Sequence, residues 1–252
     1  MFLKKKTAEK QLAVLIDPDN TTEGYLGNIF NYVDQFANCI DYFFVGGSLI
    51  IENRLDEIIL RINENCSIPV VLFPGSPYQI STLADGILLL SVISGRNPEM
   101  LIGSHVVAAP MLKKSNLEIL STGYILVNSG DRTSVEYMSN TIPIPADKPE
   151  IAVATAMAGE MLGLKLLYLD GGSGVNKPIG RKVIQQVSSN TNVPLIVGGG
   201  INTANKAKIA WESGADIVVV GNGLQNDNSL LEDIFYVKQK FNHAVSNNIE
   251  SR

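Results

Sequence analysis

Two polar residues stand just beyond the ends of apolar segments in the first fifth of this sequence, and their types can hold a metal ion. Asp17 comes after the apolar run at 12–16, and Ser48 follows the run at 42–45. A carboxylate at the end of an apolar strand needs a partner, since unpaired charge is costly to bury. Mg²⁺ binds oxygen ligands and takes few of them from the protein. Asp17 and Ser48 are therefore candidate magnesium ligands, with a turn or helix-capping role as the alternative for each.

Glycine-rich segments follow four of the apolar runs. Because glycine has no Cβ, its backbone can approach an anion closely and direct N–H groups at it. A following helix adds the partial positive charge of its N-terminus. One such segment could simply form a tight turn, but a consecutive pair late in the chain favours a phosphate site. The segments are 46–47, 170–174, 198–200 and 221–223.

The elements that must position these residues alternate between strands and helices. This alternation is typical of βα units around a parallel sheet, and the purely apolar strands indicate burial on both faces. The predicted strands are 12–16, 42–45, 69–73, 86–90, 124–127, 166–169, 194–197 and 216–220. Helix patterns cover 52–65, 97–118, 149–163, 178–190, 203–213 and 229–246.

Eight strands in 252 residues predict one (β/α)₈ TIM barrel that forms a single domain over 1–252. An open doubly wound sheet is the alternative. Too few residues separate the third and fourth strands for a full helix, so we expect that helix to be reduced or missing. The polar, proline-containing segment 129–148 is expected to be a functional loop or lid. In such barrels chemistry lies at the carboxyl ends of the strands, where the glycine segments fall.

Composition limits the function classes. The net charge is −5, which provides no basic surface for nucleic acid. No apolar run reaches membrane-spanning length, and the run after Lys4 to Lys6 is too short for a signal peptide, so we expect a cytoplasmic protein. Cys39 and Cys66 have no metal-motif spacing and are expected to be free thiols.

An ordered set of motifs carries a resemblance over nearly the whole chain. The motifs are LIDPD, FVGGS, LLSVISGRNP, IPIPADKPEIA, YLDGGSG, VGGGI and VGNG. In this order they resemble the geranylgeranylglyceryl phosphate synthase family, closest to its second group. The resemblance implies a Mg²⁺-assisted prenyltransferase that joins sn-glycerol 1-phosphate to a polyprenyl diphosphate by an ether bond and releases diphosphate. It also implies a homo-oligomer and transient membrane contact through the lipid substrate.

The resemblance assigns residues as well. Asp17 and Ser48 match the metal ligands. The glycerol phosphate site matches Tyr168, Leu169, Asp170, Gly171, Gly172, Ser173, Gly174, Gly199, Gly200, Gly221 and Asn222.

Two positions depart from the family pattern. Asp170 stands where the family commonly has Glu, so its carboxylate reaches less far. Leu15 stands where some members have a Lys directed at the phosphate, which leaves more of that work to backbone glycines. We expect Asp170 to orient the glycerol and accept its proton. Tyr168 is expected either to contact glycerol phosphate or to close over the prenyl chain, unless it is only a barrel-interior residue.

The remaining candidates are weaker. An apolar groove for the tail is expected near Phe73, Pro74, Val92 and Ile93, and Arg96 and Arg132 are candidate diphosphate contacts or solvated loop residues. His105 and His243 are not expected to be catalytic. Trp211, Met157 and Met161 are expected in the core or at a subunit contact.

Two other functions remain open at this point. One is another phosphate-handling barrel enzyme, such as a phosphosugar isomerase or lyase, which would share the late glycine loops. It would not account for Asp17-Pro18-Asp19 together with Gly46-Gly47-Ser48. The other is an inactive barrel that binds a phosphate ligand without turnover.

Overall fold

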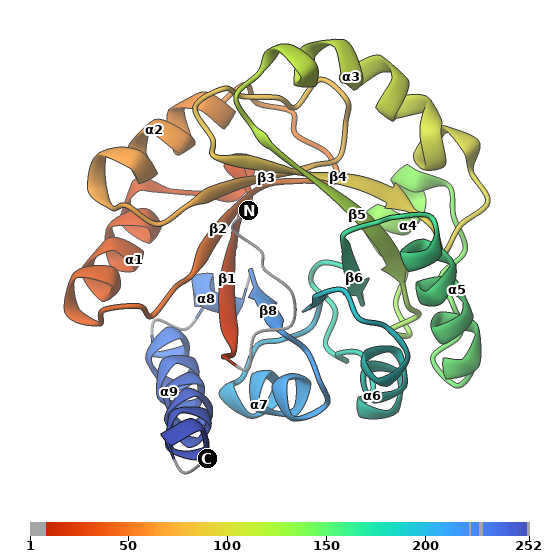
Figure 1. The fold of residues 1–252 in the computed structure, drawn as a ribbon. Coiled ribbons are helices and arrows are strands. Elements are labelled where there is room, and N and C mark those ends of the chain that lie inside the picture. The colour runs from red at the N-terminus through yellow and green to blue at the C-terminus, as the bar shows by residue number, and fades with distance from the viewer. Residues whose placement is uncertain (1–8, 222, 227–228, 251–252) are drawn as a thin grey trace.

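A computed structural model of the chain describes residues 9–221, 223–226 and 229–250. Eight parallel strands pair in sequence order and close into a barrel (Figure 1). This confirms the predicted (β/α)₈ architecture and excludes the open sheet. The strands are β1 Gln11–Ile16, β2 Tyr42–Gly47, β3 Val70–Pro74, β4 Gly86–Val92, β5 Glu118–Leu126, β6 Leu166–Asp170, β7 Leu195–Gly198 and β8 Ile217–Val220.

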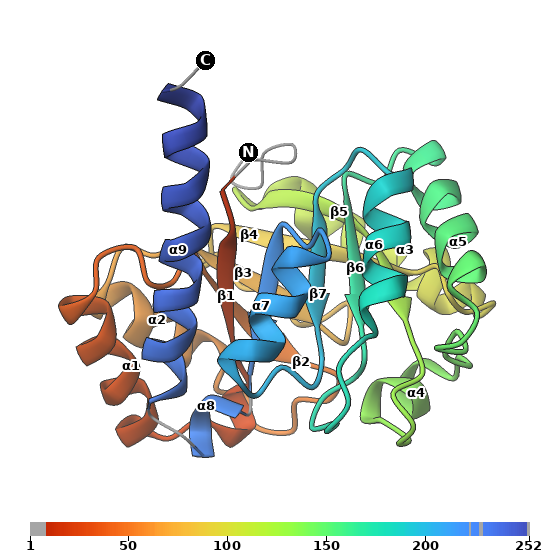
Figure 2. The same cartoon turned by 90° about the horizontal axis from the view of Figure 1, so that it is seen from below.

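Helices surround the barrel and cover the outer face of its strands. The α-helices are α1 Glu23–Gln35, α2 Leu55–Asn65, α3 Ser104–Lys114, α4 Ser134–Ser139, α5 Pro149–Met161, α6 Arg181–Asn190, α7 Ala204–Glu212, α8 Gly223–Asn226 and α9 Leu230–Glu250. A 3₁₀ turn, η1 Pro18–Asn20, follows β1, and a π-helical turn, η2 Glu99–Gly103, leads into α3. Figure 2 shows α4 and α8 at one end of the barrel and the last turns of α9 at the other.

The core has two parts because successive strand side chains point to opposite faces. One cluster lies between the strands and the helices, and it includes Trp211, which is 1% exposed. The other fills the barrel interior and includes Phe44, Tyr124 and Tyr168. The register places Tyr124 of β5 opposite Tyr168 of β6, and Asp170 opposite Gly198 of β7. Both tyrosines therefore point inward, immediately before the strands end.

No helix lies between β3 and β4, a connection that the structure describes throughout, as its short length predicted. Other expectations about helices were wrong or incomplete. Helix α1, with Thr22 as its N-cap, was not among the predicted helices. The helix expected over 97–118 ends at Lys114, because residues from Glu118 onward pair with β4 and extend β5 well before the predicted start.

The segment 129–148 is ordered in part by a short helix. The Thr133 side chain accepts a hydrogen bond from the Glu136 N–H and caps α4. Val127 and Ile144 form a parallel bridge that ties the end of the segment back to β5. The connection is therefore an ordered loop that contains a short helix. This helix, α4, lies at the carboxyl end of the strands (Figure 2).

Two simpler expectations concern cysteines and membrane spans. Cys39 and Cys66 are free, and burial raises the pKa of both thiols. Within the described ranges, no helix combines the length and apolar character needed to cross a membrane.

Candidate active site

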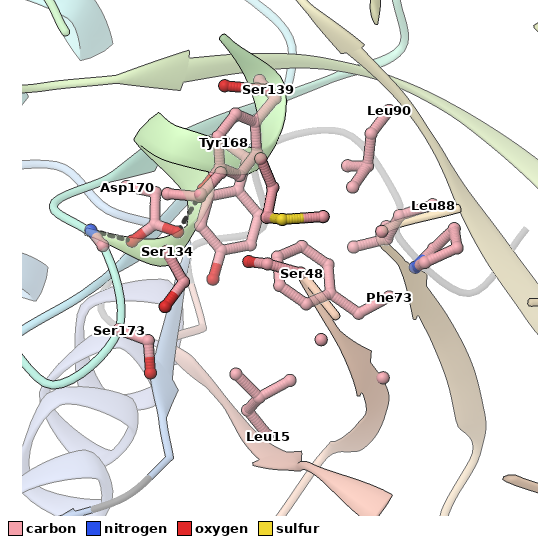
Figure 3. A pocket seen from close by; sticks show the side chains of 18 of the residues that line it. Leu15, Ser48, Phe73, Leu88, Leu90, Ser134, Ser139, Tyr168, Asp170 and Ser173 are labelled. Atoms are coloured by element: carbon pink, nitrogen blue, oxygen red, sulfur yellow. Dashed lines mark hydrogen bonds between the residues drawn. The ribbon is translucent and has the colours of Figure 1, made fainter. Parts of the chain in front are cut away.

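A cavity of about 610 Å³ opens at the carboxyl ends of the strands. Its wall combines strand ends, the glycine loops, α4 and the inner face of α3. In Figure 3, Asp170, Ser173 and Ser134 lie on one side of the space and Leu88 and Leu90 on the other. The predicted residues that line it are Asp17, Ser48, Tyr168, Asp170, Gly172, Ser173, Gly174, Gly199, Gly200 and Gly221.

Two predicted residues do not direct a side chain into this cavity, and a third lies outside the described residues. Leu169 is fully buried in the cluster between strands and helices, so its side chain points away from the cavity. Gly171 is not part of the cavity wall, and its N–H donates to the carbonyl of Gly198. Asn222 lies outside the described residues. The assignment of Leu169 and Gly171 as substrate contacts thus has no support from the geometry.

Asp170 is held at the end of β6 by two hydrogen bonds. The Gly172 N–H donates to Oδ1 at 2.7 Å, and the Tyr124 hydroxyl donates to Oδ2; both bonds are drawn in Figure 3. The side chain is 7% exposed. Burial raises the pKa of Asp170, while the hydrogen bonds from Tyr124 and Gly172 lower it. The result is an oriented carboxylate with weak solvation, which is the setting of a proton acceptor.

Aromatic stacking fixes the side chains next to Asp170. The Phe73 and Tyr168 rings stack with centroids 5.4 Å apart, and Tyr124 packs on Tyr168 at the same centroid distance. Desolvation by burial, and then the charge of Asp170, raise the pKa of Tyr168 well above its ordinary value. The Tyr168 hydroxyl therefore stays protonated and can donate a hydrogen bond.

The glycines after β6 and β7 have conformations that other residues rarely adopt. Gly172, Gly199 and Gly200 have φ of +95°, +83° and +71°. A Cβ at Gly199 would stand 2.7 Å from Oδ1 of Asp170, and a Cβ at Gly198 would collide with the Tyr168 hydroxyl. Glycine is thus required here both by the backbone and by the close approach of the two catalytic candidates.

The opposite side of the cavity holds the candidate metal ligands. A Cβ at Gly47 would stand 3.8 Å from the carboxyl carbon of Asp17, so this carboxylate lies over the end of β2, beside the residue that precedes Ser48. Asp17 also caps η1: its Oδ1 accepts from the Asp19 N–H, and its Oδ2 accepts from the Asn20 side chain at 2.7 Å. The capping alternative is therefore correct in part, and each oxygen keeps lone pairs for another partner.

Sequence reasoning did not find the contacts that join the β1 and β2 loops. The Asp19 carboxylate accepts hydrogen bonds from the N–H groups of Ile51 and Glu52 at 2.6 and 3.1 Å. The Arg54 guanidinium donates to the carbonyls of Pro18 and Thr21 at 3.2 Å each. Asp19, two residues after Asp17 in the DPD motif, was the available signal. These contacts hold the loops that carry Asp17 and Ser48 next to each other.

An apolar branch of the cavity extends toward α3. Phe73, Pro74 and Val92 line it as expected, whereas Ile93 does not. His105 is half-buried in its wall, and its Nε2 lies 3.0 Å from the Ser91 hydroxyl. Sequence reasoning missed other members of this wall, which are Ile80, Leu88, Leu90, Met100, Ala108, Leu112, Val135 and Met138.

The charge of the cavity is unusual for a candidate phosphate site. Over the described part of the chain, its wall contains Asp17 and Asp170 but no lysine or arginine side chain. Arg96 instead donates to the carbonyls of Ile93 and Gly95, and Arg132 is exposed outside the wall. An anion in this cavity would therefore meet backbone N–H groups and hydroxyls rather than basic side chains.

Tyr124 is the most informative residue that sequence reasoning missed. It lies inside a strand and carries no motif. Its register partner is Tyr168, so the available signal was two inward-facing tyrosines on adjacent strands, one of them two residues before Asp170.

The fold and the cavity define a (β/α)₈ barrel with a two-sided site at the carboxyl ends of its strands: a glycine-lined anion side with a buried carboxylate, and an apolar branch. A family model described as the PcrB family matches residues 5–238. The chain belongs to the PcrB family.

Named relatives agree with this assignment and with the motif resemblance. A geranylgeranylglyceryl phosphate synthase of Chitinophaga pinensis is 52% identical over 235 residues, which are 92% of this chain and 91% of that protein. One from Pyrococcus horikoshii is 39% identical over 233 residues, 92% of this chain and 90% of that protein.

Solved structures give the same result. The (S)-3-O-geranylgeranylglyceryl phosphate synthase of Thermoplasma acidophilum, in complex with its substrate sn-glycerol-1-phosphate, superposes with a TM-score of 0.85. The two sequences are 30% identical, and the superposition covers 92% of this chain and 94% of that structure. A 3-hexulose-6-phosphate synthase from Salmonella typhimurium has a TM-score of 0.60 at 15% identity, which shows a shared fold alone.

Proposed function

We propose that this chain is a prenyltransferase that joins sn-glycerol 1-phosphate to a polyprenyl diphosphate through an ether bond and releases diphosphate. The observation that carries the proposal is one cavity in which the clamped Asp170 carboxylate adjoins both the glycine loops and a long apolar branch. Family membership and the names of the relatives point to the same reaction.

The acceptor occupies the glycine side in this proposal. Its phosphate lies against the backbone of Gly199, Gly200 and Gly221, where positive φ at the first two and the absence of side chains expose N–H groups. Ser173 adds a hydroxyl to the same side of the cavity. These groups together take the role that a lysine at position 15 would have. The glycerol then extends toward Asp170 and Tyr168.

Asp170 accepts the proton of the attacking hydroxyl as the new carbon–oxygen bond forms. The glycerol oxygen bonds to C1 of the prenyl group, and the electron pair of the broken C–O bond leaves on diphosphate. The Tyr168 hydroxyl donates a hydrogen bond to the glycerol and orients it. The prenyl tail occupies the apolar branch between Phe73, Leu88 and Leu90 (Figure 3), which also excludes water from the allylic carbon.

The residues near Asp17 fit Mg²⁺. A carboxylate and a neighbouring hydroxyl are hard oxygen donors, and the described residues contain no cluster of three or more His, Cys, Asp or Glu for a fully protein-ligated ion. Mg²⁺ typically takes one or two carboxylates and completes its octahedron with water and substrate phosphate oxygens. When bound, it would neutralise the diphosphate that leaves. Asp17 and Ser48 would hold it, with the β1 and β2 loops joined by Asp19.

Incubation of the purified chain with Mg²⁺, labelled sn-glycerol 1-phosphate and a ladder of prenyl diphosphates tests the function. The expected product is an alkali-stable prenyl ether of glycerol phosphate, identified by mass spectrometry. The sn-glycerol 3-phosphate enantiomer serves as the matched control acceptor. Retention of both substrates without ether product would favour the inactive phosphate-binding barrel, and turnover of a phosphosugar would favour the isomerase or lyase.

We also propose that the chain forms a homo-oligomer. Helix α5 and the residue after it expose Ile151, Met161 and Leu162, with Met161 and Leu162 each 79% exposed. Exposed apolar side chains on a helix can mark a contact with another protein molecule. Sedimentation velocity on the full chain tests this, with Met161→Glu as the variant that should shift a multimer toward the monomer.

A further inference from the structure

Tyr124 contacts Asp170, and neither the motifs nor the assignment of the site explains why a tyrosine stands there. Its hydroxyl donates to Oδ2 of Asp170, and its ring is 3% exposed inside the barrel. A buried phenol needs a partner for its hydroxyl, and many positions would satisfy that need with a backbone carbonyl. Here the partner is the carboxylate that we assign as the proton acceptor.

The hydrogen bonds of Asp170 fix the orientation of its carboxylate plane. Oδ1 accepts from the Gly172 N–H and Oδ2 accepts from Tyr124, so rotation about the last side-chain bond would break one bond or both. An ionised carboxylate oxygen has two lone-pair sites, so each oxygen keeps one. Because Asp170 lines the cavity, these remaining sites can face an incoming hydroxyl.

The Tyr124 hydroxyl is itself held in place. Its ring packs against Tyr168 with centroids 5.4 Å apart and against Phe73 at 6.4 Å. The strand register fixes its backbone opposite Tyr168. The phenol is therefore a preorganised donor, and it loses little conformational freedom when it holds the carboxylate.

We propose that Tyr124 is a positioning residue for the acceptor step, which holds Asp170 through the hydroxyl-to-Oδ2 hydrogen bond in the orientation that receives the glycerol proton. This inference rests on the proposed function. It assigns Tyr124 no contact with the reacting atoms, so its effect must pass through Asp170.

The groups that determine the titration of Asp170 can be named. Tyr124 of β5, Tyr168 of β6 and the Gly172 N–H surround it, and the backbone of Gly199 approaches it from the β7 loop. Asp17 and His105 line other parts of the same cavity. Burial is the largest cause that raises the Asp170 pKa, and the Tyr124 bond opposes it. Loss of that bond must raise the pKa further.

The test compares Tyr124→Phe, Asp170→Asn and the double variant. Alone, Tyr124→Phe should lower kcat by about 10- to 100-fold, the effect of a small misplacement of a reacting group. Its KM for sn-glycerol 1-phosphate should change by less than about threefold. In the Asp170→Asn background the same substitution should cause no further loss, because two residues that act as one unit are non-additive. Losses that multiply would overturn the positioning role.

Tyr42→Phe is the matched control. Tyr42 also lies in the barrel interior, 4% exposed, and its hydroxyl accepts a hydrogen bond from the Gln11 side chain away from the cavity wall. Its kcat should equal that of the wild type, while circular dichroism and Tm report folding for every variant. A similar kcat loss in both tyrosine variants would indicate a general packing defect and overturn the proposal.

A second readout does not depend on turnover. Carbon-13 NMR of protein labelled at aspartate carboxyls, with Asp170→Asn for assignment, follows the titration of Asp170. In Tyr124→Phe its pKa should rise, and the acidic limb of the kcat profile should move to higher pH with it. An unshifted titration overturns the proposal. Absence of ether product from the wild type, with the titration shift present, overturns the proposed function and shows that the bond is only a structural contact.

Discussion

The two sides of the cavity differ in how far their carboxylates are fixed by the protein. Asp170, on the glycine side, is buried, and both its oxygens accept hydrogen bonds from Gly172 and Tyr124. Asp17, on the metal side, is half-buried, and its oxygens accept from Asp19 and Asn20 of the turn that follows it. Each carboxylate oxygen thus keeps one lone-pair site on both sides. The difference is that Asp170 is buried and held by a neighbouring strand, which we call the rigid side, whereas Asp17 is half-buried and held by its own turn, which we call the open side.

This difference corresponds to two kinds of substrate. Glycerol phosphate is small and of constant shape, so a rigid glycine lining with a clamped carboxylate can fit it in advance. A prenyl diphosphate carries most of the negative charge and a long apolar tail, and the described cavity wall supplies it no lysine or arginine. In the proposed reaction, a Mg²⁺ ion held by Asp17 and Ser48 would supply the missing charge. We therefore expect the rigid side to bind the acceptor, glycerol phosphate, and the open side to bind the donor, the prenyl diphosphate.

The largest effect is expected when the rigid side loses its proton acceptor. Asp170→Asn should cut kcat by about 10²- to 10⁴-fold, the usual contribution of general acid–base groups. Steady-state kinetics with saturating Mg²⁺ measure it. Asp170→Glu should stay within about tenfold of the wild type, because it keeps a carboxylate with an altered reach.

Two outcomes for Asp170→Asn would contradict the role of Asp170 as proton acceptor. If Asp170→Asn raises KM for sn-glycerol 1-phosphate and leaves kcat intact, Asp170 only positions the acceptor and has no base role. If Asn and wild type are equally active, the buried carboxylate does not belong to the mechanism.

The open side should respond differently to loss of its carboxylate. Asp17→Ala should reduce Mg²⁺-dependent transfer by at least about 100-fold, because even outer partners of a metal ligand are worth about 10- to 100-fold. Binding of sn-glycerol 1-phosphate, measured by calorimetry, should be retained. Normal turnover of this variant at subsaturating Mg²⁺ would show that Asp17 is not the metal ligand.

Sequence reasoning predicted most of the fold because apolar strands and glycine-marked ends leave local signals. The eight strands, the barrel and the missing helix after β3 were all predictable. It missed α1, because a sequence with two glycines and only a few buried apolar residues has a weak helical pattern. It also extended a helix to Glu118 and began the fifth strand only at 124, because residues 118–123 become strand residues only through pairing with β4.

For the site, residues in motifs could be placed at the cavity from the sequence, and residues defined by strand register could not. Asp17, Ser48, Asp170 and the glycines are marked by type and position at strand ends. Leu169 was included because it lies inside a motif, yet strand alternation turns it outward. Tyr124 could be found only from the inward face that β5 and β6 share.

A smaller effect should separate local geometry from general strain on the glycine side. Gly199→Ala introduces a Cβ at φ +83°, 2.7 Å from Oδ1 of Asp170, so it should raise KM for sn-glycerol 1-phosphate by about 10- to 100-fold. Gly163→Ala is the matched control, since Gly163 lies in the turn between α5 and β6 with φ +87°, and a Cβ there would meet no atom within 4 Å. Both should lower Tm, but only Gly199→Ala should weaken acceptor binding.

The smallest effects should come from one hydroxyl on each side of the cavity, Ser48 and Ser173. Ser48→Ala removes a neutral oxygen ligand while the Asp17 carboxylate remains. The Mg²⁺ concentration that gives the half-maximal rate should therefore rise by about tenfold or less, and kcat should be restored at high Mg²⁺. Ser173→Ala should instead raise KM for sn-glycerol 1-phosphate by about three- to tenfold, the value of one hydrogen bond, and leave the Mg²⁺ dependence unchanged. Rate measurements over a grid of Mg²⁺ and acceptor concentrations separate these responses. Each variant is the control for the other, because both delete one hydroxyl from the same cavity.

If both variants shifted both the Mg²⁺ dependence and the acceptor dependence equally, the metal and the acceptor phosphate would share one site. The division between a rigid and an open side would then be wrong.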